Sequence, residues 1–277
     1  MWVVLVTAVV VVAVSAVVIG QITFTRSISA EIEELFAASR NARPALVTEA
    51  DLAGLPGPVR RWLRYSQVVR KARPVTIRLK QEGQFRLSEE RGWMPFTAEE
   101  YYTTDPPGYI WVATFKTAPL LSIFGRDRYN DGTGSINMRL LYVIPVANKS
   151  GGGLDQGALL RYLNETMWFP AAVVSPYITW EAIDARSARA TMSYGKVTAS
   201  ATFVFDEQGR LTDMRAERYD DAKGRVLPWS TPIRAYGQFG GVRIPVEGDG
   251  KWEYESGDFT YIRLRVTDVE YDRPAEF

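Results

Sequence analysis

The chain has 277 residues, with 33 Lys and Arg against 32 Asp and Glu, and it contains neither histidine nor cysteine. These absences exclude Ser-His-Asp and Cys-His catalysis, disulfides and the usual zinc and copper sites. The net charge of +1 gives no reason to expect nucleic acid as a partner. We therefore expect no metal, no cofactor and no catalytic residue, and we favour a binding protein over an enzyme.

An apolar segment opens the chain. Residues 2–20 are almost entirely apolar, and about 20 such residues span a bilayer as a helix. A cleaved signal peptide is the alternative, but the run is longer than a typical signal core and no basic residue precedes it. We predict that residues 1–24 form a single-pass anchor, residues 25–50 a juxtamembrane linker, and residues 51–277 one β domain.

Two helical segments are expected between the anchor and the first strand. Residues 27–40 extend the anchor as a short helix, and residues 51–69 form a helix interrupted near Pro56 and Pro58. The second segment carries a basic patch, for which a solvated helix face is the favoured interpretation. Contact with anionic headgroups is the alternative. The patch consists of Arg60, Arg61, Arg64, Arg70, Lys71 and Arg73.

Alternating apolar and polar residues predict β-strands through most of the domain. Residues 75–87 give the clearest strand, about 40 Å long, and Gly83 lies in its apolar register, where a kink or a close backbone approach is expected. Both faces of the strand at 109–116 are apolar, so we expect both to be covered. Other strands are predicted at 95–103, 126–129, 135–142, 178–184, 188–194, 197–205, 211–219, 236–245, 246–254 and 259–271, with loops at 146–153 and 220–232.

One interior helix is predicted, over residues 154–170. Asp155 is its expected N-cap, and Pro170 should end it by about Phe169. A helix set between two runs of strands has to lie on a sheet. The fold class is therefore mainly β: an antiparallel open half-barrel of about 11 strands wrapped on a central helix, plus an N-terminal transmembrane helix. The helix carries two stripes, Leu159, Tyr162, Leu163 and Thr166 on one side and Arg161, Asn164, Glu165 and Trp168 on the other.

Small residues occupy the apolar faces of the later strands. They do not fill a core, and protein interiors are close-packed, so something else must take the space. The central helix is the favoured occupant, and a ligand in an apolar cavity is the other; both fit different parts of one sheet. The residues are Ala188, Ala190, Ala199, Ala201, Gly248 and Gly250.

Charged residues near the predicted helix and hairpins are candidate sites. Arg161 and Glu165, four residues apart, form either a surface ion pair or a polar group at the mouth of a cavity, beside Trp168. Glu99 and Glu100 point to opposite faces of one strand, so at most one faces a hollow, and a solvated strand is favoured.

The arginines of residues 126–128 precede a turn and are expected to be solvated, unless one meets a phosphate. The glycines at 151–153 lack the following Lys-Ser/Thr of a phosphate-binding loop. The tryptophans are more often core residues than ligand contacts. The candidate ligand-binding residues are Tyr102, Trp111, Arg128, Arg161, Glu165, Trp168, Trp180 and Trp229.

Five segments resemble an uncharacterised bacterial family with one N-terminal anchor, and the resemblance covers nearly the whole domain. They are residues 93–102, 126–129, 160–165, 168–170 and 228–229. At the level of fold, the order of strands and helix is similar to that of the periplasmic lipoprotein carriers (LolA/LolB-like), which are unclosed barrels of about eleven antiparallel strands. This chain departs from their lipidated members because it has no cysteine.

The resemblance implies a single-pass protein of the cytoplasmic membrane with an extracytoplasmic domain. The arginines after the apolar segment favour the opposite orientation by the positive-inside rule, and the resemblance overrides them. We expect a cell-envelope protein that binds or carries a hydrophobic or amphipathic ligand, a lipid or a lipoprotein acyl chain, between sheet and helix. A carboxylate-dependent hydrolase using Glu165 or Glu181, and a structural protein with a protein partner, are the alternatives. The oligomeric state is not predicted.

Overall fold

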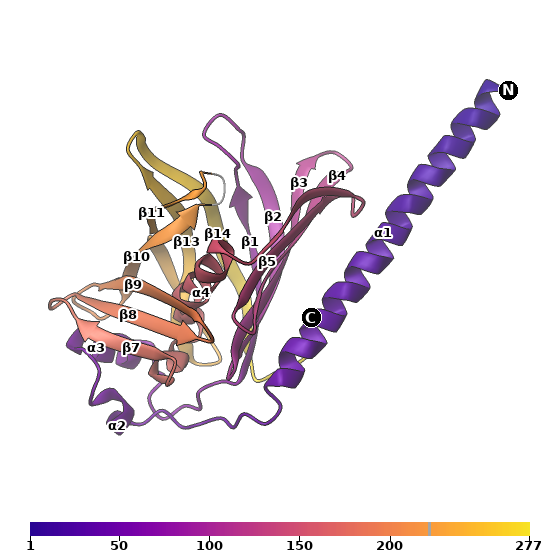
Figure 1. Cartoon of the computed structure of the whole chain (residues 1–277). Coiled ribbons are helices and arrows are strands. Elements are labelled where there is room, and N and C mark those ends of the chain that lie inside the picture. Colours follow the sequence, from indigo (N-terminus) through magenta and orange to yellow (C-terminus); the bar gives the residue numbers. More distant parts are fainter. Residues whose placement is uncertain (221–222) are drawn as a thin grey trace.

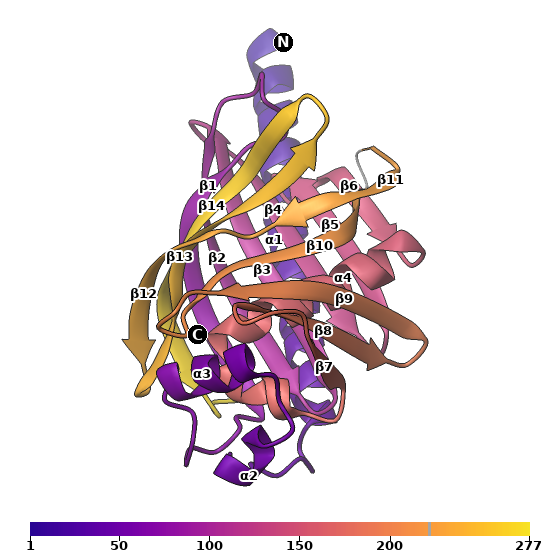
Figure 2. The same cartoon turned by 90° about the vertical axis from the view of Figure 1, so that its left-hand side faces the viewer.

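One large antiparallel sheet forms most of the computed structural model, which describes residues 1–220 and 223–277. Its 14 strands run in the order β6-β5-β4-β3-β2-β1-β14-β13-β11-β10-β9-β8-β7, and β12 also pairs with β13. The sheet curls into an open half-barrel around a central helix, as predicted (Figures 1 and 2). The strands are β1 (Thr76–Phe85), β2 (Met94–Thr104), β3 (Pro107–Ala118), β4 (Leu121–Asn130), β5 (Thr133–Leu140), β6 (Ile144–Ser150), β7 (Ile178–Ala182), β8 (Ser187–Tyr194), β9 (Val197–Phe205), β10 (Leu211–Asp220), β11 (Arg225–Ser230), β12 (Ile233–Phe239), β13 (Val242–Tyr254) and β14 (Gly257–Tyr271).

The strand count exceeds the prediction because two segments predicted as loops are strands. Residues 144–150 form β6, which lies at the edge of the sheet and is mostly exposed on both faces, so its sequence lacks the alternation of a half-buried strand. Residues 225–230 form β11, and Pro228 in its middle made this segment look like a loop. Residues 221–222 of the predicted loop lie outside the described residues.

Short helices close one end of the half-barrel (Figure 2). Helix α2 (Glu49–Leu52) starts at a capping box between Thr48 and Asp51, and α3 (Gly57–Tyr65) follows the predicted interruption. Helix α3 buries Val59, Trp62 and Leu63. The Trp62 ring lies against Phe203 and Phe205 on β9, at centroid distances of 5.8 and 5.7 Å.

The central helix α4 (Gly153–Glu165) lies inside the curled sheet and continues as the 3-10 turns η1 (Thr166–Trp168) and η2 (Pro170–Val174). Phe169 leaves the helical conformation before Pro170, as predicted. The predicted N-cap was wrong: Gly152 occupies that position, and Asp155 instead accepts a hydrogen bond of 2.7 Å from the backbone N–H of Gly134 on β5. Asp155 thus ties the helix to the sheet.

Gly83 lies where two strands come too close for a side chain. A Cβ atom at this position would lie 2.1 Å from the carbonyl oxygen of Arg263 on β14. The predicted close approach is therefore confirmed. Strand β1 ends at Phe85, two residues before the predicted end, and the chain turns into the β1–β2 hairpin.

Helix α1 (Trp2–Ala38) has two parts with different surroundings. Its first part, in which the mean hydropathy of an 18-residue window is 3.0, has no buried residue and is long and apolar enough to cross a membrane. Its second part buries Phe24, Ile28, Ile32, Leu35 and Phe36 against the outer face of β2 and β3, including Tyr101 and Ile110. This packing covers the second face of β3, as predicted from its two apolar sides.

The alanines of the later strands are filled from within the protein. Ala188, Ala190, Ala199 and Ala201 are buried, and α4 contacts both β8 and β9. Their small side chains let the helix approach the sheet closely. Gly248 and Gly250 of β13 instead line a cavity. Docking of the central helix, the favoured occupant, is therefore confirmed for β8 and β9, and a cavity borders β13.

We predict that Leu35→Asp detaches the second part of α1 from the sheet. Truncating a buried leucine to alanine already costs about 2–5 kcal/mol, and a buried unpaired carboxylate costs more. Hydrogen exchange of the full chain in nanodiscs should show lost protection at residues 24–36. Ala30→Asp places the same charge on the exposed side of this helix and should leave protection unchanged. Equal protection in both variants would mean that α1 is not held by this contact.

Candidate ligand-binding cavity

A cavity of about 390 Å³ lies between the upper part of the sheet and α4, a size within the range of small-molecule sites. Its floor is formed by the second predicted stripe, which consists of Arg161, Asn164 and Glu165 of α4 and Trp168 of η1. Its walls are mainly aromatic and aliphatic. They include Phe85 on β1, Trp111 and Phe115 on β3, Ile136 and Met138 on β5, Trp229 on β11, Trp252 on β13, and Phe259, Ile262 and Leu264 on β14.

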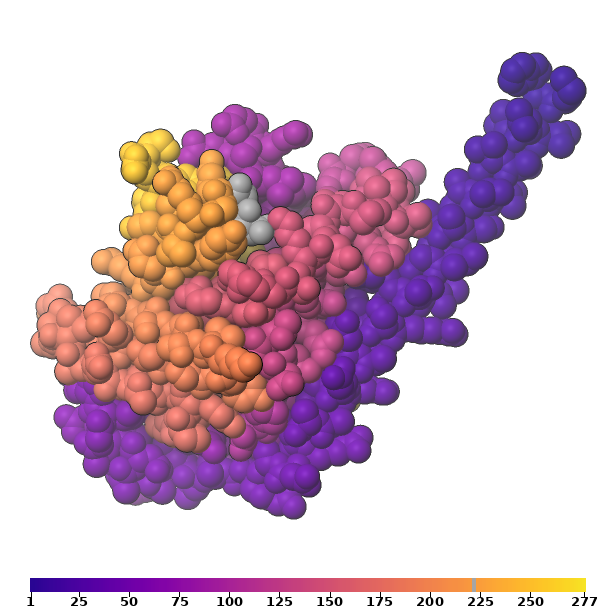
Figure 3. Space-filling model, in the orientation of Figure 1, coloured from indigo at the N-terminus to yellow at the C-terminus, as the bar shows by residue number. Residues whose placement is uncertain are grey.

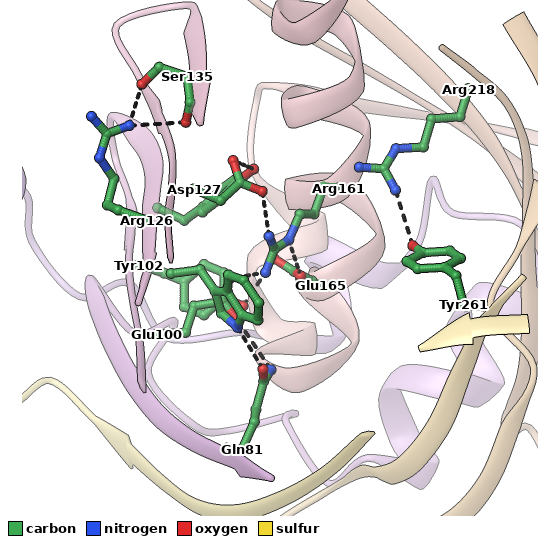
Figure 4. Close-up of polar contacts among 12 residues, drawn as sticks. Gln81, Glu100, Tyr102, Arg126, Asp127, Ser135, Arg161, Glu165, Arg218 and Tyr261 are labelled. Carbon is green, nitrogen blue, oxygen red and sulfur yellow. Dashed lines mark hydrogen bonds and ion pairs between the residues drawn. The ribbon is translucent and has the colours of Figure 1, made fainter. Parts of the chain in front are cut away.

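Arg161 is the centre of the polar floor (Figure 4). Its guanidinium donates to three carboxylates: Glu100 at 2.8 Å, Asp127 at 2.6 Å and Glu165 at 2.6 Å. The three acids come from β2, β4 and α4, so one cation joins the helix to two strands. The guanidinium also lies 4.9 Å from the centroids of both the Tyr109 and the Trp111 rings, which adds cation–π attraction.

A second layer of groups orients the three acids. The Tyr102 hydroxyl donates to Glu165 at 3.0 Å, and the Tyr109 hydroxyl donates to Asp127 at 3.3 Å. The Gln81 amide donates to Glu100 at 3.2 Å and accepts from the Trp111 indole N–H at 2.9 Å. The network is thus supported from three strands, which fixes the rotamers of its members.

The floor holds more acids than its arginine can neutralise. Glu100 is fully buried, and burial, with the neighbouring Glu165 charge, raises the pKa of its carboxyl well above the ordinary value. Burial also raises the pKa of Glu165, although Arg161 opposes the shift. The protonated form of Glu100 is therefore favoured more than that of a solvent-exposed glutamate.

A second arginine lines the cavity across from this network (Figure 4). Arg218 on β10 lies over the Trp229 ring at 4.6 Å and the Trp252 ring at 5.9 Å. Its Nη1 donates a long hydrogen bond of 3.4 Å to the Tyr261 hydroxyl. That hydroxyl also accepts from the Trp229 indole N–H at 3.1 Å.

The structure brings together five of the predicted binding residues, Trp111, Arg161, Glu165, Trp168 and Trp229, on the wall of this cavity. Tyr102 lies behind the wall and reaches it through its bond to Glu165. Arg128 and Trp180 lie elsewhere. Arg128 is on the outer face of β4, paired with Glu34 of α1 at 3.1 Å, and Trp180 on β7 packs against Phe203 at 5.1 Å.

The expectation of a solvated strand at Glu99 and Glu100 was wrong for Glu100. Its side chain is 0% exposed, whereas that of Glu99 on the opposite face is 43% exposed. The expected solvation of residues 126–128 was also wrong. Asp127 points inward to Arg161, while Arg126 lies on the other side of the strand and pairs with Glu31 of α1 at 3.0 Å (Figure 4).

Sequence reasoning missed Gln81, Glu100, Asp127 and Arg218, although a signal for them was present. Glu100 points to the same face of its strand as the buried Phe96, Ala98 and Tyr102. Gln81 likewise points to the same face as Ile77 and Leu79. A charged or amide side chain in the apolar register of a strand marks a buried polar site. Glu181, the other acid considered for a hydrolase, is exposed on β7, outside the cavity.

Comparison with known proteins assigns a family. The sequence model of the family described as "Family of unknown function (DUF6544)" matches residues 45–264, which confirms the expected uncharacterised family. No curated protein matches the chain.

The expected similarity to the lipoprotein carriers is found among solved structures. A LolA superfamily protein from Nitrosomonas europaea has a TM-score of 0.41 at 8% identity, over 83% of this chain and 95% of that chain. A DUF1329 family protein from Desulfovibrio piger has a TM-score of 0.45 at 9% identity, over 82% and 94%. A domain assigned to outer membrane lipoprotein sorting from Vibrio parahaemolyticus has a TM-score of 0.41 at 12% identity, over 73% and 87%. Structural similarity with these TM-scores and identities supports no conclusion about function.

We predict that Glu100→Gln stabilises the protein increasingly as the pH rises. A carboxyl whose pKa is raised in the folded state contributes its stability below the ordinary pKa of 4.5 and loses it as the pH rises toward the folded pKa. Glutamine mimics the protonated form, so the advantage of the variant should grow by up to about 1.4 kcal/mol per pH unit above that point.

Thermal unfolding between pH 5 and 8, followed by tryptophan fluorescence, measures this trend. Glu99→Gln makes the same change on the outer face of the same strand and should show no such growth. A Glu100→Gln variant that is less stable than the wild type at pH 8 would mean that Glu100 is ionised and paired.

Proposed function

Because the chain belongs to the Family of unknown function (DUF6544), its role has to be inferred from the cavity, and we propose that it is a membrane-anchored protein that binds a lipid-like amphipathic ligand. The observation that carries the proposal is an apolar cavity of about 390 Å³ above a polar floor that is already paired. Burial of an acyl chain against such walls is favourable by about 0.8 kcal/mol per methylene.

Two glycines border the cavity at places where neighbouring groups come close. An added Cβ at Gly248 would lie 3.1 Å from the carbonyl oxygen of Pro232, and one at Gly250 would lie 2.7 Å from the Ile262 side chain. The two glycines therefore allow β13 to pack closely. The open space lies beside them, between the apolar walls and α4, and an apolar space costs stability unless a ligand fills it.

The anchor is the apolar first part of α1, which projects away from the domain (Figure 1). A single helix runs from Trp2 to Ala38. Its second half is packed against the sheet, which favours a retained anchor over a cleaved signal. Following the resemblance noted in the sequence, we place the protein in the cytoplasmic membrane with its domain on the extracytoplasmic side.

We predict that a diazirine-bearing palmitate, photoactivated with the full chain in nanodiscs, labels the cavity walls. Mass spectrometry of the peptides should locate crosslinks on β3, β13 and β14. Ile262→Trp, which fills the cavity from β14, should lower this labelling about tenfold or more, because the added indole takes the space of several methylenes. Crosslinks restricted to residues 2–20 would contradict the proposal.

The matched control is Arg265→Trp, three residues along the same strand. The Arg265 side chain is 62% exposed on the outer face, so this variant adds the same indole outside the cavity. Its labelling should equal that of the wild type. Equal loss in both variants would trace the effect to the indole itself and not to the filled cavity.

A further inference from the structure

We infer that the cavity selects ligands with an anionic headgroup, a carboxylate or a phosphate, and that Arg218 binds it. The inference rests on the proposed function and names the chemical class of its ligand. The two arginines of the cavity differ in their partners. Arg161 holds three carboxylates, whereas Arg218 makes no ion pair with any residue among 1–220 and 223–277.

The hydrogen-bonding capacity of Arg218 is almost unused. A guanidinium has five N–H donors, and within the described part of the chain only Nη1 donates, over 3.4 Å to Tyr261. Its Nε is buried without a partner. A half-buried cation in this state is costly unless a partner arrives. The Trp229 and Trp252 rings hold the planar group in place, so it is positioned before a ligand binds.

The neighbouring acid does not supply the missing partner. Asp220 also lines the cavity, but it accepts from the Tyr254 hydroxyl at 2.9 Å and from the backbone N–H of Lys223 at 3.2 Å. Arg218 lies opposite Leu227 in the β10–β11 ladder, two residue pairs from the end of that ladder. A headgroup bound there leaves the apolar walls of β3, β5 and β14 for the acyl chain.

The test compares three photoactivatable probes with the same chain: palmitate, lysophosphatidic acid and hexadecanol. In the wild type, at least one anionic probe should label the cavity at about tenfold lower concentration than the alcohol, the typical gain from a charged hydrogen bond. Arg218→Gln should abolish this preference and keep labelling by the alcohol. The anionic probe that is preferred identifies the headgroup as carboxylate or phosphate.

Arg215→Gln is the matched control, because Arg215 lies on the outer face of the same strand and is 63% exposed. It should keep the wild-type preference. A wild type without preference, or a preference that survives Arg218→Gln, would overturn the inference while the proposed function stands. Absence of cavity labelling by all three probes would instead count against the proposed function.

A second inference comes from a different surface: we propose that the open rim of the half-barrel contacts the bilayer that α1 spans. Strands β1, β3, β5, β8, β10 and β13 run in the same direction, because neighbouring strands alternate. The connections that follow β1, β3, β5, β10 and β13 lie at one edge, which we call the rim, whereas the β8–β9 turn lies against Gly132 of the β4–β5 turn. The cavity opens toward it, since Leu87, Phe115, Met138, Tyr254 and Phe259 near these turns line the cavity.

The rim carries most of the exposed apolar side chains of the domain. Among the described residues after α1, nine large apolar side chains are exposed, and all but Leu46 and Ile183 lie at the rim. Exposed apolar groups gathered at one edge mark an interaction surface. The seven are Leu87, Leu120, Leu121, Val143, Ile144, Val146 and Val226.

Helix α1 identifies the bilayer as the partner. Gly20 touches the β5–β6 turn, where an added Cβ would lie 3.1 Å from the carbonyl oxygen of Tyr142. The 18 residues before it extend about 27 Å along the helix axis, close to the thickness of the hydrocarbon core. Figures 1 and 3 show the hairpin tips and the first part of α1 on the same side of the domain. When α1 spans the membrane, the rim lies at its surface.

Spin labels test this placement, and the absence of cysteine in the chain lets single introduced cysteines be labelled uniquely. In nanodiscs, labels at Leu120→Cys and Ile144→Cys should be protected from an aqueous nickel relaxant and reached by oxygen. A label at Ile183→Cys, another exposed apolar position, should behave as aqueous. Aqueous labels at both rim positions, with Val10→Cys in the bilayer, would overturn the inference. An aqueous label at Val10→Cys would contradict the anchor itself.

Discussion

The Arg161 guanidinium holds together parts of the chain that are far apart in sequence. Its carboxylate partners lie on β2, β4 and α4, and the support of Glu100 reaches β1 through Gln81. On the opposite side, Asn164 accepts a hydrogen bond of 2.8 Å from Thr231, which follows β11. Helix α4 is thereby fixed across the half-barrel, and the space above it remains open.

The polar floor and the apolar walls have separate consequences. Removing one partner from a buried ion cluster is strongly destabilising, whereas the intact cluster adds little net stability. The cluster therefore serves mainly to place α4 at one depth. The depth of α4 in turn sets the volume of the cavity. Arg218 stands outside this arrangement, held by the Trp229 and Trp252 rings and by a long hydrogen bond to the Tyr261 hydroxyl.

The fold was largely predictable because its main signals are local. Strand alternation, the helix-ending Pro170 and the small residues of β8 and β9 each act within a few positions. The site was less predictable, because ion partners such as Asp127 and Arg161 are brought together only by the curl of the sheet. Arg128 was a candidate ligand-binding residue, but its charge pairs with α1 on the outer face of the sheet. This contact joins segments about 90 residues apart, so no local sequence pattern predicts it.

The most direct measurement is whether an acyl chain lies above α4. Nuclear Overhauser effects between a protonated fatty acid and methyl-labelled full chain, in nanodiscs of deuterated lipid, report this contact by proximity alone. The account predicts cross-peaks from the acyl chain to the methyl groups of Ile136, Met138 and Ile262, which line the cavity. Cross-peaks confined to the valines of the first part of α1 would contradict it.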